Sequence, residues 1–372
     1  TALAAFAPNF SFLLAGRMIQ ACGASVMGPL LMNVMLVSFP REKRGTAMGV
    51  FGLVLFSAPA IGPTLSGYIV EYYDWRMLFE MILPIALLSL ILAFWKLRNV
   101  METRPIRIDY LSVVWSAAGF GGLLYGVSNA SILGWSDRSI ISTVTIGIIG
   151  LMCFVIRQIR LHEPLLDLRV YKYPMFALGS IIAMIVAAAM FSGMIMPPAY
   201  MQDVRGITPL QAGLMMFPGA ALLGIMSPIT GRLFDKFGPK VLALIGLLIT
   251  GTTTYLFSLL QVDSAVAYII LLYALRMFGM SMIMMPIMTN GLNQLPTRLN
   301  PHGTAVNNTA QQVAGSLGTA IFMTIMNNRA SSASIRMMAE VDPTVANQEQ
   351  LEHIGRVALL EGIQLSFLIA TF

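Results

Sequence analysis

The 372-residue chain is 57% hydrophobic and only 11% charged, with a mean hydropathy of +0.76 and a formal net charge of +6. Soluble domains carry roughly 25% charged residues, so the composition excludes a soluble globular protein and predicts an all-α polytopic membrane protein. The basic residues are scattered among short connectors, which favours a lipid bilayer over nucleic acid as the partner. Cys22 and Cys153 both fall inside apolar runs and indicate no disulfide framework.

Eleven apolar runs of about 20 residues predict membrane-spanning helices. They cover residues 10–37, 46–70, 77–95, 110–128, 139–156, 175–199, 209–230, 240–260, 265–288, 303–326 and 357–372. The polar stretch 327–356 predicts a surface loop. The last run is short and Thr1 directly precedes an apolar stretch, so we expect both ends of the chain to be truncated.

The placement of lysine and arginine predicts the orientation of these helices. Fifteen of the 23 basic residues fall in the connectors 38–46, 96–109, 157–174, 231–240 and 289–302, and six fall in the alternate connectors. The remaining two, Arg17 and Arg276, lie inside predicted helices. Because cytoplasmic connectors carry the basic excess, the first set is cytoplasmic and the first helix runs inward.

Arg17 is the first charge inside an apolar run. An arginine in hydrocarbon costs about 2.5 to 17 kcal/mol, depending on the reference state, so such a residue is expected to be paired, wetted by a cavity or functional. The pattern recurs at Arg276, and each arginine precedes a Gly-Thr-Ala triplet, by 28 residues to Gly45 and by 27 to Gly303. The equal spacing predicts a parallel duplication.

The duplication predicts the domain organisation. Three predicted helices precede the Arg276 helix within its copy, whereas no complete helix precedes the Arg17 helix. We therefore expect three further helices before residue 1, and fourteen in the intact protein. Residues 1–97 are then a partial N-terminal half, residues 98–174 two inserted linker helices with a cytoplasmic connector, and residues 175–372 the C-terminal half.

The stretch Gly231–Lys240, GRLFDKFGPK, joins two predicted spans on the cytoplasmic side. Gly231 and Gly238 are expected to allow tight turns. Asp235 can accept hydrogen bonds from the N-terminus of a neighbouring helix or from an arginine. A simple basic connector is the alternative interpretation.

This ten-residue pattern resembles the loop motif of the major facilitator superfamily, G-x-L-x-D-[RK]-x-G-[RK]-[RK], with Pro239 at the first basic position of the ending. The resemblance implies a cytoplasmic gate loop whose residues control conformation and do not bind ligand. The gate residues are then Gly231, Arg232, Asp235, Lys236 and Gly238.

The second span contains Ala58–Gly67, APAIGPTLSG, near its outer end. Its prolines remove helical hydrogen bonds and kink the helix, and its small residues allow a close neighbour, so packing alone would also explain it. The pattern resembles the antiporter signature G-x-x-x-G-P-x-x-G-G of drug/proton exporters, with Ala58 and Ser66 at two glycine positions. The signature residues are Pro59, Gly62, Pro63 and Gly67.

Two further motifs resemble those of the fourteen-helix drug/proton antiporters. Arg17 and Gln20 match R-x-x-Q-[GA], and Trp75–Pro84 matches W-R-x-x-F-x-x-x-x-P, with Glu80 where that group usually has asparagine. The resemblance covers residues 10–326 and is greatest to the lincomycin-resistance/EmrB-like branch. It implies that the arginine assists proton transfer and that the main protonated carboxylate lies on the first helix, outside this chain.

Arginine keeps its proton, so Arg17 would act by holding a nearby carboxylate ionised. Within this chain only Glu80 and Glu361 are acidic residues inside apolar spans. Our hypothesis is that Glu80 tunes or shares the proton step. A water-exposed interfacial carboxylate is the alternative.

A polar stripe on the span from 303 predicts a cavity lining or interhelical hydrogen bonds; it comprises Thr304, Asn308, Gln311, Gly315 and Gly318. Methionines between 277 and 288 would suit a pocket for varied apolar ligands, although core or lipid-facing filling is the alternative. The cavity candidates are Met27, Asn33, Arg276, Met280, Asn308 and Gln311. Arg276 is assigned to a structural or cavity-lining role, and Arg17 to proton coupling.

The three histidines have no metal-ligand spacing and there is no G-x-x-x-x-G-K-[ST] loop, so neither a metal, a cofactor, an enzyme nor an ATP-driven pump is expected. With the resemblance, the sequence predicts a monomeric, proton-driven exporter of amphipathic or cationic drugs in the bacterial cell membrane. The alternatives are an exporter of a lipid or metabolite on the same fold, and a membrane receptor or sensor that does not transport.

Overall fold

The computed structural model describes residues 1–40, 43–96, 109–340 and 348–372, which are helical and contain no strand. The predicted boundary between residues 97 and 98 lies outside these ranges. The helices are α1 (Ala2–Ala5), α2 (Phe10–Ser38), α3 (Arg44–Tyr72), α4 (Met77–Lys96), α5 (Tyr110–Leu133), α6 (Arg138–Arg160), α7 (Pro174–Ala199), α8 (Pro209–Phe237), α9 (Pro239–Phe257), α10 (Val266–Ser281), α11 (Met284–Asn293), α12 (Asn300–Ala339) and α13 (Gln348–Thr371). A π-turn (Tyr200–Val204) extends α7, and short 3₁₀ turns occur at Leu168–Lys172 and Thr297–Leu299.

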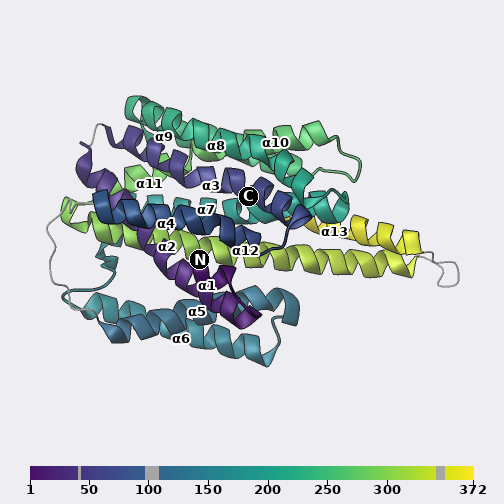
Figure 1. Cartoon of the computed structure of the whole chain (residues 1–372), viewed down its shortest axis with the longest axis horizontal. Helices are drawn as coiled ribbons and strands as arrows, with labels where there is room; N and C mark the ends of the chain where they lie inside the picture. Colours follow the sequence, from purple (N-terminus) through teal and green to yellow (C-terminus); the bar gives the residue numbers. More distant parts are fainter. Residues whose placement is uncertain (41–42, 97–108, 341–347) are drawn as a thin grey trace.

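Among the described residues, ten helical segments are long and apolar enough to cross a membrane, with α10 and α11 forming one of them. The predicted spans fall on helices in the predicted order, although 240–260 runs past the end of α9 and 265–288 is divided between α10 and α11. The predicted span 303–326 lies in α12, which is not among the ten. The all-α polytopic fold is confirmed. In Figure 1, α8, α9 and α10 lie along one side of the bundle, α3, α7 and α11 in the middle, and the α5–α6 pair along the opposite side.

The predicted surface loop at 327–356 is wrong. Residues 327–339 continue α12, and residues 348–356 begin α13. The 40 residues of α12 make a helix of about 60 Å at 1.5 Å per residue, which is twice the roughly 30 Å hydrocarbon thickness. The end of α12 and the start of α13 therefore project together from the outer end of the bundle (Figure 1).

The outer extension is rich in alanine, methionine, arginine, glutamine and glutamate, all good helix formers. Its polarity excludes a membrane span but not a helix. At the base of the extension α12 and α13 pack closely, because a Cβ on Gly362 of α13 would overlap the carbonyl oxygen of Met326 in α12. The last helix is accordingly 24 residues long, not the short segment predicted from residue 357.

The inserted helices α5 and α6 pack on each other through glycines. A Cβ on Gly122 would lie 2.8 Å from the Thr143 carbonyl oxygen. At their cytoplasmic ends, Arg157 donates two hydrogen bonds to the Asp109 carboxylate, at 2.6 and 2.9 Å. These bonds, with one from Ser112, hold the pKa of Asp109 well below its usual range. The carboxylate is therefore a permanent anion that fastens the pair at physiological pH.

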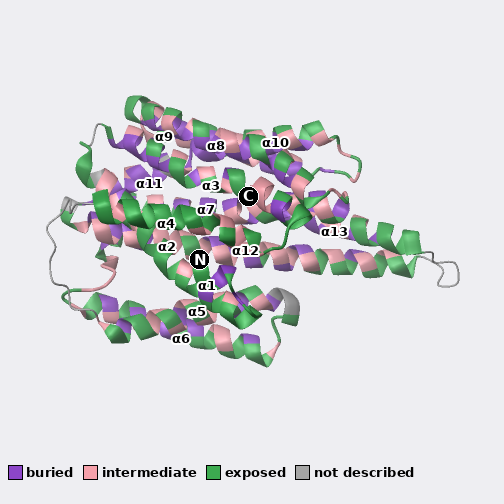
Figure 2. Ribbon diagram, viewed as in Figure 1, coloured by how far each residue is buried: buried purple, intermediate pink, exposed green. Residues whose placement is uncertain are grey.

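The buried residues concentrate in the C-terminal half, whereas α2 and α4 are mostly exposed (Figure 2). Methionines supply much of the core, including Met190, Met196, Met216, Met277 and Met280. Unbranched thioether side chains fill irregular gaps between kinked helices. These methionines therefore fill the core, which was the alternative to a ligand pocket.

Candidate functional site

The helices before the α5–α6 pair meet the helices after it mainly through α3 and α8, which lie antiparallel and side by side (Figure 1). Glycines line the contact along its length. A Cβ on Gly49 would lie 2.6 Å from the Ser227 carbonyl oxygen, one on Gly67 would lie 2.9 Å from Leu210 Cα, and one on Gly213 2.8 Å from Thr64 Cα. The two backbones are thus in direct contact, as small residues permit between membrane helices.

Asp235 forms a polar latch at the cytoplasmic end of this contact. Its carboxylate accepts hydrogen bonds from the backbone N–H groups of Gly45, at 3.0 Å, and Thr46, at 2.9 Å, and from the Thr46 hydroxyl at 2.8 Å. These groups belong to the first turn of α3, where amides lack helical acceptors and the helix dipole favours an anion. The sequence-based prediction that Asp235 accepts from a neighbouring helix N-terminus is confirmed.

Arg44 adds a second contact at the same end and was not singled out from the sequence as a site residue. Its guanidinium donates to Asn293 Oδ1 on α11 at 3.0 Å and to the Phe39 carbonyl oxygen at 3.4 Å. The side chain is buried. The Gly45-Thr46-Ala47 triplet that follows Arg44 is the sequence signal that could have indicated this site. The triplet served only as a landmark of the repeat, and it does not specify Asn293 as the partner of Arg44.

The other gate residues lie around this latch. Gly231 is not at a turn, as predicted, but inside α8, where a Cβ would overlap the Gly45 backbone. Gly238 does form the turn, with φ of +75°, and Pro239 starts α9 at a position that tolerates proline. Arg232 and Lys236 are exposed.

The antiporter-like stretch lies in the outer half of α3, which continues as one helix past Pro59 and Pro63. Gly67 and the Pro63 carbonyl face the start of α8. Gly62 is exposed, and no atom lies within 4 Å of a Cβ placed on it. Close packing therefore explains Gly67 but not Gly62.

Arg17 lies on the exposed surface of α2 and donates a hydrogen bond to Gln20 Oε1 at 3.2 Å. Gln20 in turn donates to the Thr1 hydroxyl at 2.8 Å. Glu80, in the first turn of α4, is exposed. In the part of the chain that the structure describes, no hydrogen bond or ion pair joins Glu80 to Arg17.

Arg276 occupies the opposite environment, with 1% of its surface exposed. It donates to the Ala189 carbonyl oxygen at 2.8 Å and to the Thr254 hydroxyl at 3.3 Å, while Nη1 has no acceptor among the described residues. A Cβ on Gly193 of α7 would overlap the guanidinium. Arg276 therefore clamps α10 to α7 and α9 in the interior of the described chain.

The remaining cavity candidates are dispersed. Met27 is exposed, Asn33 and Asn308 are half-buried, and Met280 is fully buried in the core. Gln311 lines a small gap between α7, α11 and α12, with its amide 4.0 Å from Met288 Sδ. In the polar stripe of α12, Gly315 packs against the Phe191 ring and Gly318 against Ala188, which makes that part a helix contact.

A family model described as Major Facilitator Superfamily matches residues 1–319. The chain belongs to the major facilitator superfamily. It is 44% identical to the lincomycin resistance protein LmrB of Bacillus subtilis over all of this chain and 76% of that protein. It is 50% identical to the uncharacterized MFS-type transporter YhcA of Bacillus subtilis, over 88% of this chain and 62% of that protein.

More distant superfamily members include the tetracenomycin C resistance and export protein of Streptomyces glaucescens, 25% identical over 90% of this chain and 62% of that protein. The chain thus spans less than two thirds of the length of some of its relatives. The membership and the spanning helices together make it a multi-pass cell-membrane protein.

Proposed function

We propose that the intact protein is a secondary active exporter that exchanges protons for amphipathic or cationic drugs, antibiotics among them, by alternating access. Superfamily membership supports transport, and relatives named for resistance to lincomycin and tetracenomycin C support this cargo class. The observation that carries the proposal is the Asp235 latch, because it joins the two halves by hydrogen bonds that can break and reform.

Alternating access requires one end of the α3–α8 contact to open while the other end holds. At the cytoplasmic end, opening separates the Asp235 carboxylate from the α3 amides, both of which water can solvate. At the outer end, backbone contact between Gly67 and Leu210 supplies a pivot. Glycine-lined surfaces let the helices rock as rigid bodies, since no side chains interlock between them.

Proton coupling is assigned to the Arg17 region. The guanidinium stays charged at all relevant pH values and holds a facing carboxylate ionised until a proton or a cationic substrate competes for it. Gln20 orients the guanidinium through their hydrogen bond. The energy source is the proton gradient, no cofactor takes part, and the working unit is a monomer.

Reconstitution of the full-length protein into liposomes tests the proposal. With an imposed pH gradient, we expect uphill movement of a cationic dye such as ethidium and of lincomycin, abolished by a protonophore. Dye movement independent of the gradient would refute proton coupling. Substrate binding with no flux under any gradient would favour the receptor or sensor interpretation.

Glu80→Gln tests the hypothesis that Glu80 tunes or shares the proton step. If this carboxylate tunes the proton step, the variant shifts the pH dependence of efflux while expression and substrate binding stay normal. Identical pH profiles for the variant and the parent would remove Glu80 from the proton step and leave it as an interfacial residue.

A further inference from the structure

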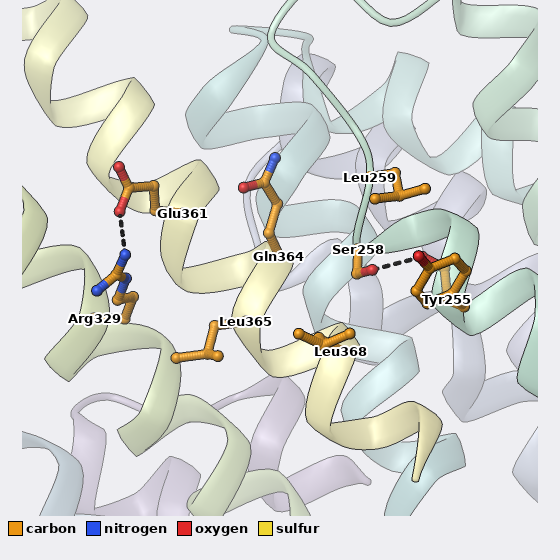
Figure 3. Close-up of a pocket in the computed structure, with 8 residues that line it drawn as sticks. All are labelled: Tyr255, Ser258, Leu259, Arg329, Glu361, Gln364, Leu365 and Leu368. Carbon is orange, nitrogen blue, oxygen red and sulfur yellow. Dashed lines mark hydrogen bonds and ion pairs between the residues drawn. The ribbon is translucent and has the colours of Figure 1, made fainter.

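A pocket of about 680 Å³ lies between α9, α12 and α13 at the outer end of the C-terminal half, away from the α3–α8 contact (Figure 3). Its polar lining includes Arg329, Glu361 and Gln364, and its apolar lining includes Leu259, Leu365 and Leu368. The volume is within the roughly 300–1,000 Å³ range of small-molecule sites. The proposed transport cycle gives this pocket no role.

Arg329 and Glu361 line the pocket, and Arg336 contacts Glu361 from outside the lining, so this cluster of three side chains carries a net positive charge. Glu361 Oε1 accepts a hydrogen bond from Arg336 at 2.7 Å. Its Oε2 lies 2.9 Å from Arg329 Nη2 as an ion pair, but without the angles of a hydrogen bond. One carboxylate thus serves two guanidinium groups. Arg329 is 43% exposed and Glu361 23%, so the arginine keeps free N–H groups toward the pocket and solvent.

The apolar side extends into the membrane. Leu365 and Leu368 follow Glu361 by one and two turns of α13, and seven residues of helix cover about 10 Å. Leu259 is 55% exposed and Leu368 37%, although both line the pocket. Leu259 follows the end of α9 in the outer connector, whereas Leu368 lies further along the candidate span of α13, where an exposed leucine can contact an acyl chain.

The walls of the pocket are fixed. Gln364 donates from Nε2 to the Leu260 carbonyl oxygen at 2.6 Å, which ties α13 to the loop after α9. Tyr200 holds the same loop by donating to the Gln261 carbonyl oxygen at 2.6 Å. These hydrogen bonds fix the shape of the pocket. Its charged side chains lie toward the outer end of α13, and its leucines Leu365 and Leu368 lie further along that helix.

We propose that this pocket binds one anionic phospholipid of the outer leaflet. Its phosphodiester pairs with Arg329, whose planar guanidinium matches phosphate oxygens in two-point contact. One acyl chain lies over Leu365 and Leu368. The net positive charge selects a headgroup that is anionic overall, such as phosphatidylglycerol, over zwitterionic phosphatidylcholine.

Native mass spectrometry of the full chain in mild detergent, titrated with dioleoyl phosphatidylglycerol and dioleoyl phosphatidylcholine, tests the assignment. We expect one phosphatidylglycerol to bind more tightly than phosphatidylcholine. Arg329→Gln should weaken it about tenfold, the loss expected for one charge-assisted pair. The matched control is Arg138→Gln, an exposed arginine at the outer end of α6, which should leave the affinity within about twofold.

Glu361→Gln separates lipid binding from a merely structural ion pair. Removing the carboxylate frees both arginines and should tighten phosphatidylglycerol binding, whereas a structural role predicts weaker or unchanged binding. Equal affinities for the two lipids, or a phosphatidylglycerol preference that survives Arg329→Gln, would overturn the proposal. So would preferential binding of tetraphenylphosphonium that disappears in Glu361→Gln, since the site would then select cationic amphiphiles.

Discussion

The two segments that each contain an arginine followed by a Gly-Thr-Ala triplet place these landmarks in opposite environments. In the first segment, Arg17 is exposed, and the backbone N–H groups of Gly45 and Thr46 donate hydrogen bonds to the Asp235 carboxylate of α8. In the second segment, Arg276 is buried against backbone, and Thr304 is 0% exposed with a hydroxyl that has no partner among the described residues. The sequence pattern is shared, but the interactions are not.

The difference shows that a repeated residue does not repeat its role. Arg276 donates to a carbonyl and a hydroxyl, although its Nη1 has no acceptor among the described residues. Its guanidinium occupies the space above Gly193, so Arg276 behaves as an interior clamp. Within the described residues, Gln20 is the only hydrogen-bond partner of the Arg17 side chain. The Arg276 guanidinium is held by a backbone carbonyl and stabilises the packing of its helices. The Arg17 guanidinium lies beside the flexible amide of Gln20, so it can respond when a neighbouring group gains or loses a proton.

The largest expected effect comes from Arg276→Ala. The change leaves the Ala189 carbonyl and the Thr254 hydroxyl without their donor and opens a cavity, and it should destabilise the protein by about 3–5 kcal/mol. Thermal unfolding in detergent measures it. Arg17→Ala is the matched control and should change stability by less than about 0.5 kcal/mol. Equal losses for the two variants would remove the distinction between clamp and coupling residue.

Gly193→Ala sharpens the clamp assignment. Its added methyl group overlaps the guanidinium and should cost about 1–3 kcal/mol by overpacking. In the Arg276→Ala background the same methyl group enters space that the guanidinium has left, and its effect should fall below about 0.5 kcal/mol, so a double-mutant cycle reports the contact. Additive losses would mean that Gly193 is required for another reason.

Much of the fold was predictable from the sequence, but the partners at the interface were not. Hydropathy located the ten candidate spanning segments of the described chain. The chemistry of Asp235 indicated either a helix N-terminus or an arginine as its partner, and the structure shows the helix N-terminus. That partner is Thr46, which is 189 residues away, and no local pattern specifies it. Gly231 was taken for a turn residue because a glycine in a short connector and a glycine under a crossing helix look alike in sequence. The extension of α12 beyond residue 326 was missed because it is polar. A polar sequence is excluded from the membrane, but it can still form a helix outside it.

Asp235→Ala tests the latch between α8 and α3. It removes a carboxylate that caps α3, which should cost about 1–2 kcal/mol at that end and favour opening toward the cytoplasm. In a background with Cys22 and Cys153 replaced by serine, Ser227→Cys in the α3–α8 contact can be labelled with an impermeant maleimide applied to the cytoplasmic face. We expect faster labelling in the Asp235→Ala variant, and unchanged rates would show that the glycine contact alone keeps this end closed.

The smallest effects distinguish the two threonines of the repeat. Thr46→Val removes the hydroxyl bond to Asp235 but leaves the backbone bonds, and it should cost about 0.5–1.5 kcal/mol. Thr304→Val replaces a buried hydroxyl that has no partner among the described residues, and it should be neutral to within about 0.5 kcal/mol or slightly stabilising. Both substitutions preserve shape, so paired thermal unfolding curves compare the hydrogen bonds directly. A larger loss of stability for Thr304→Val than for Thr46→Val would mean that the Thr304 hydroxyl also has a hydrogen-bond partner. The two segments would then be alike at the Gly-Thr-Ala triplet and differ only at their arginines.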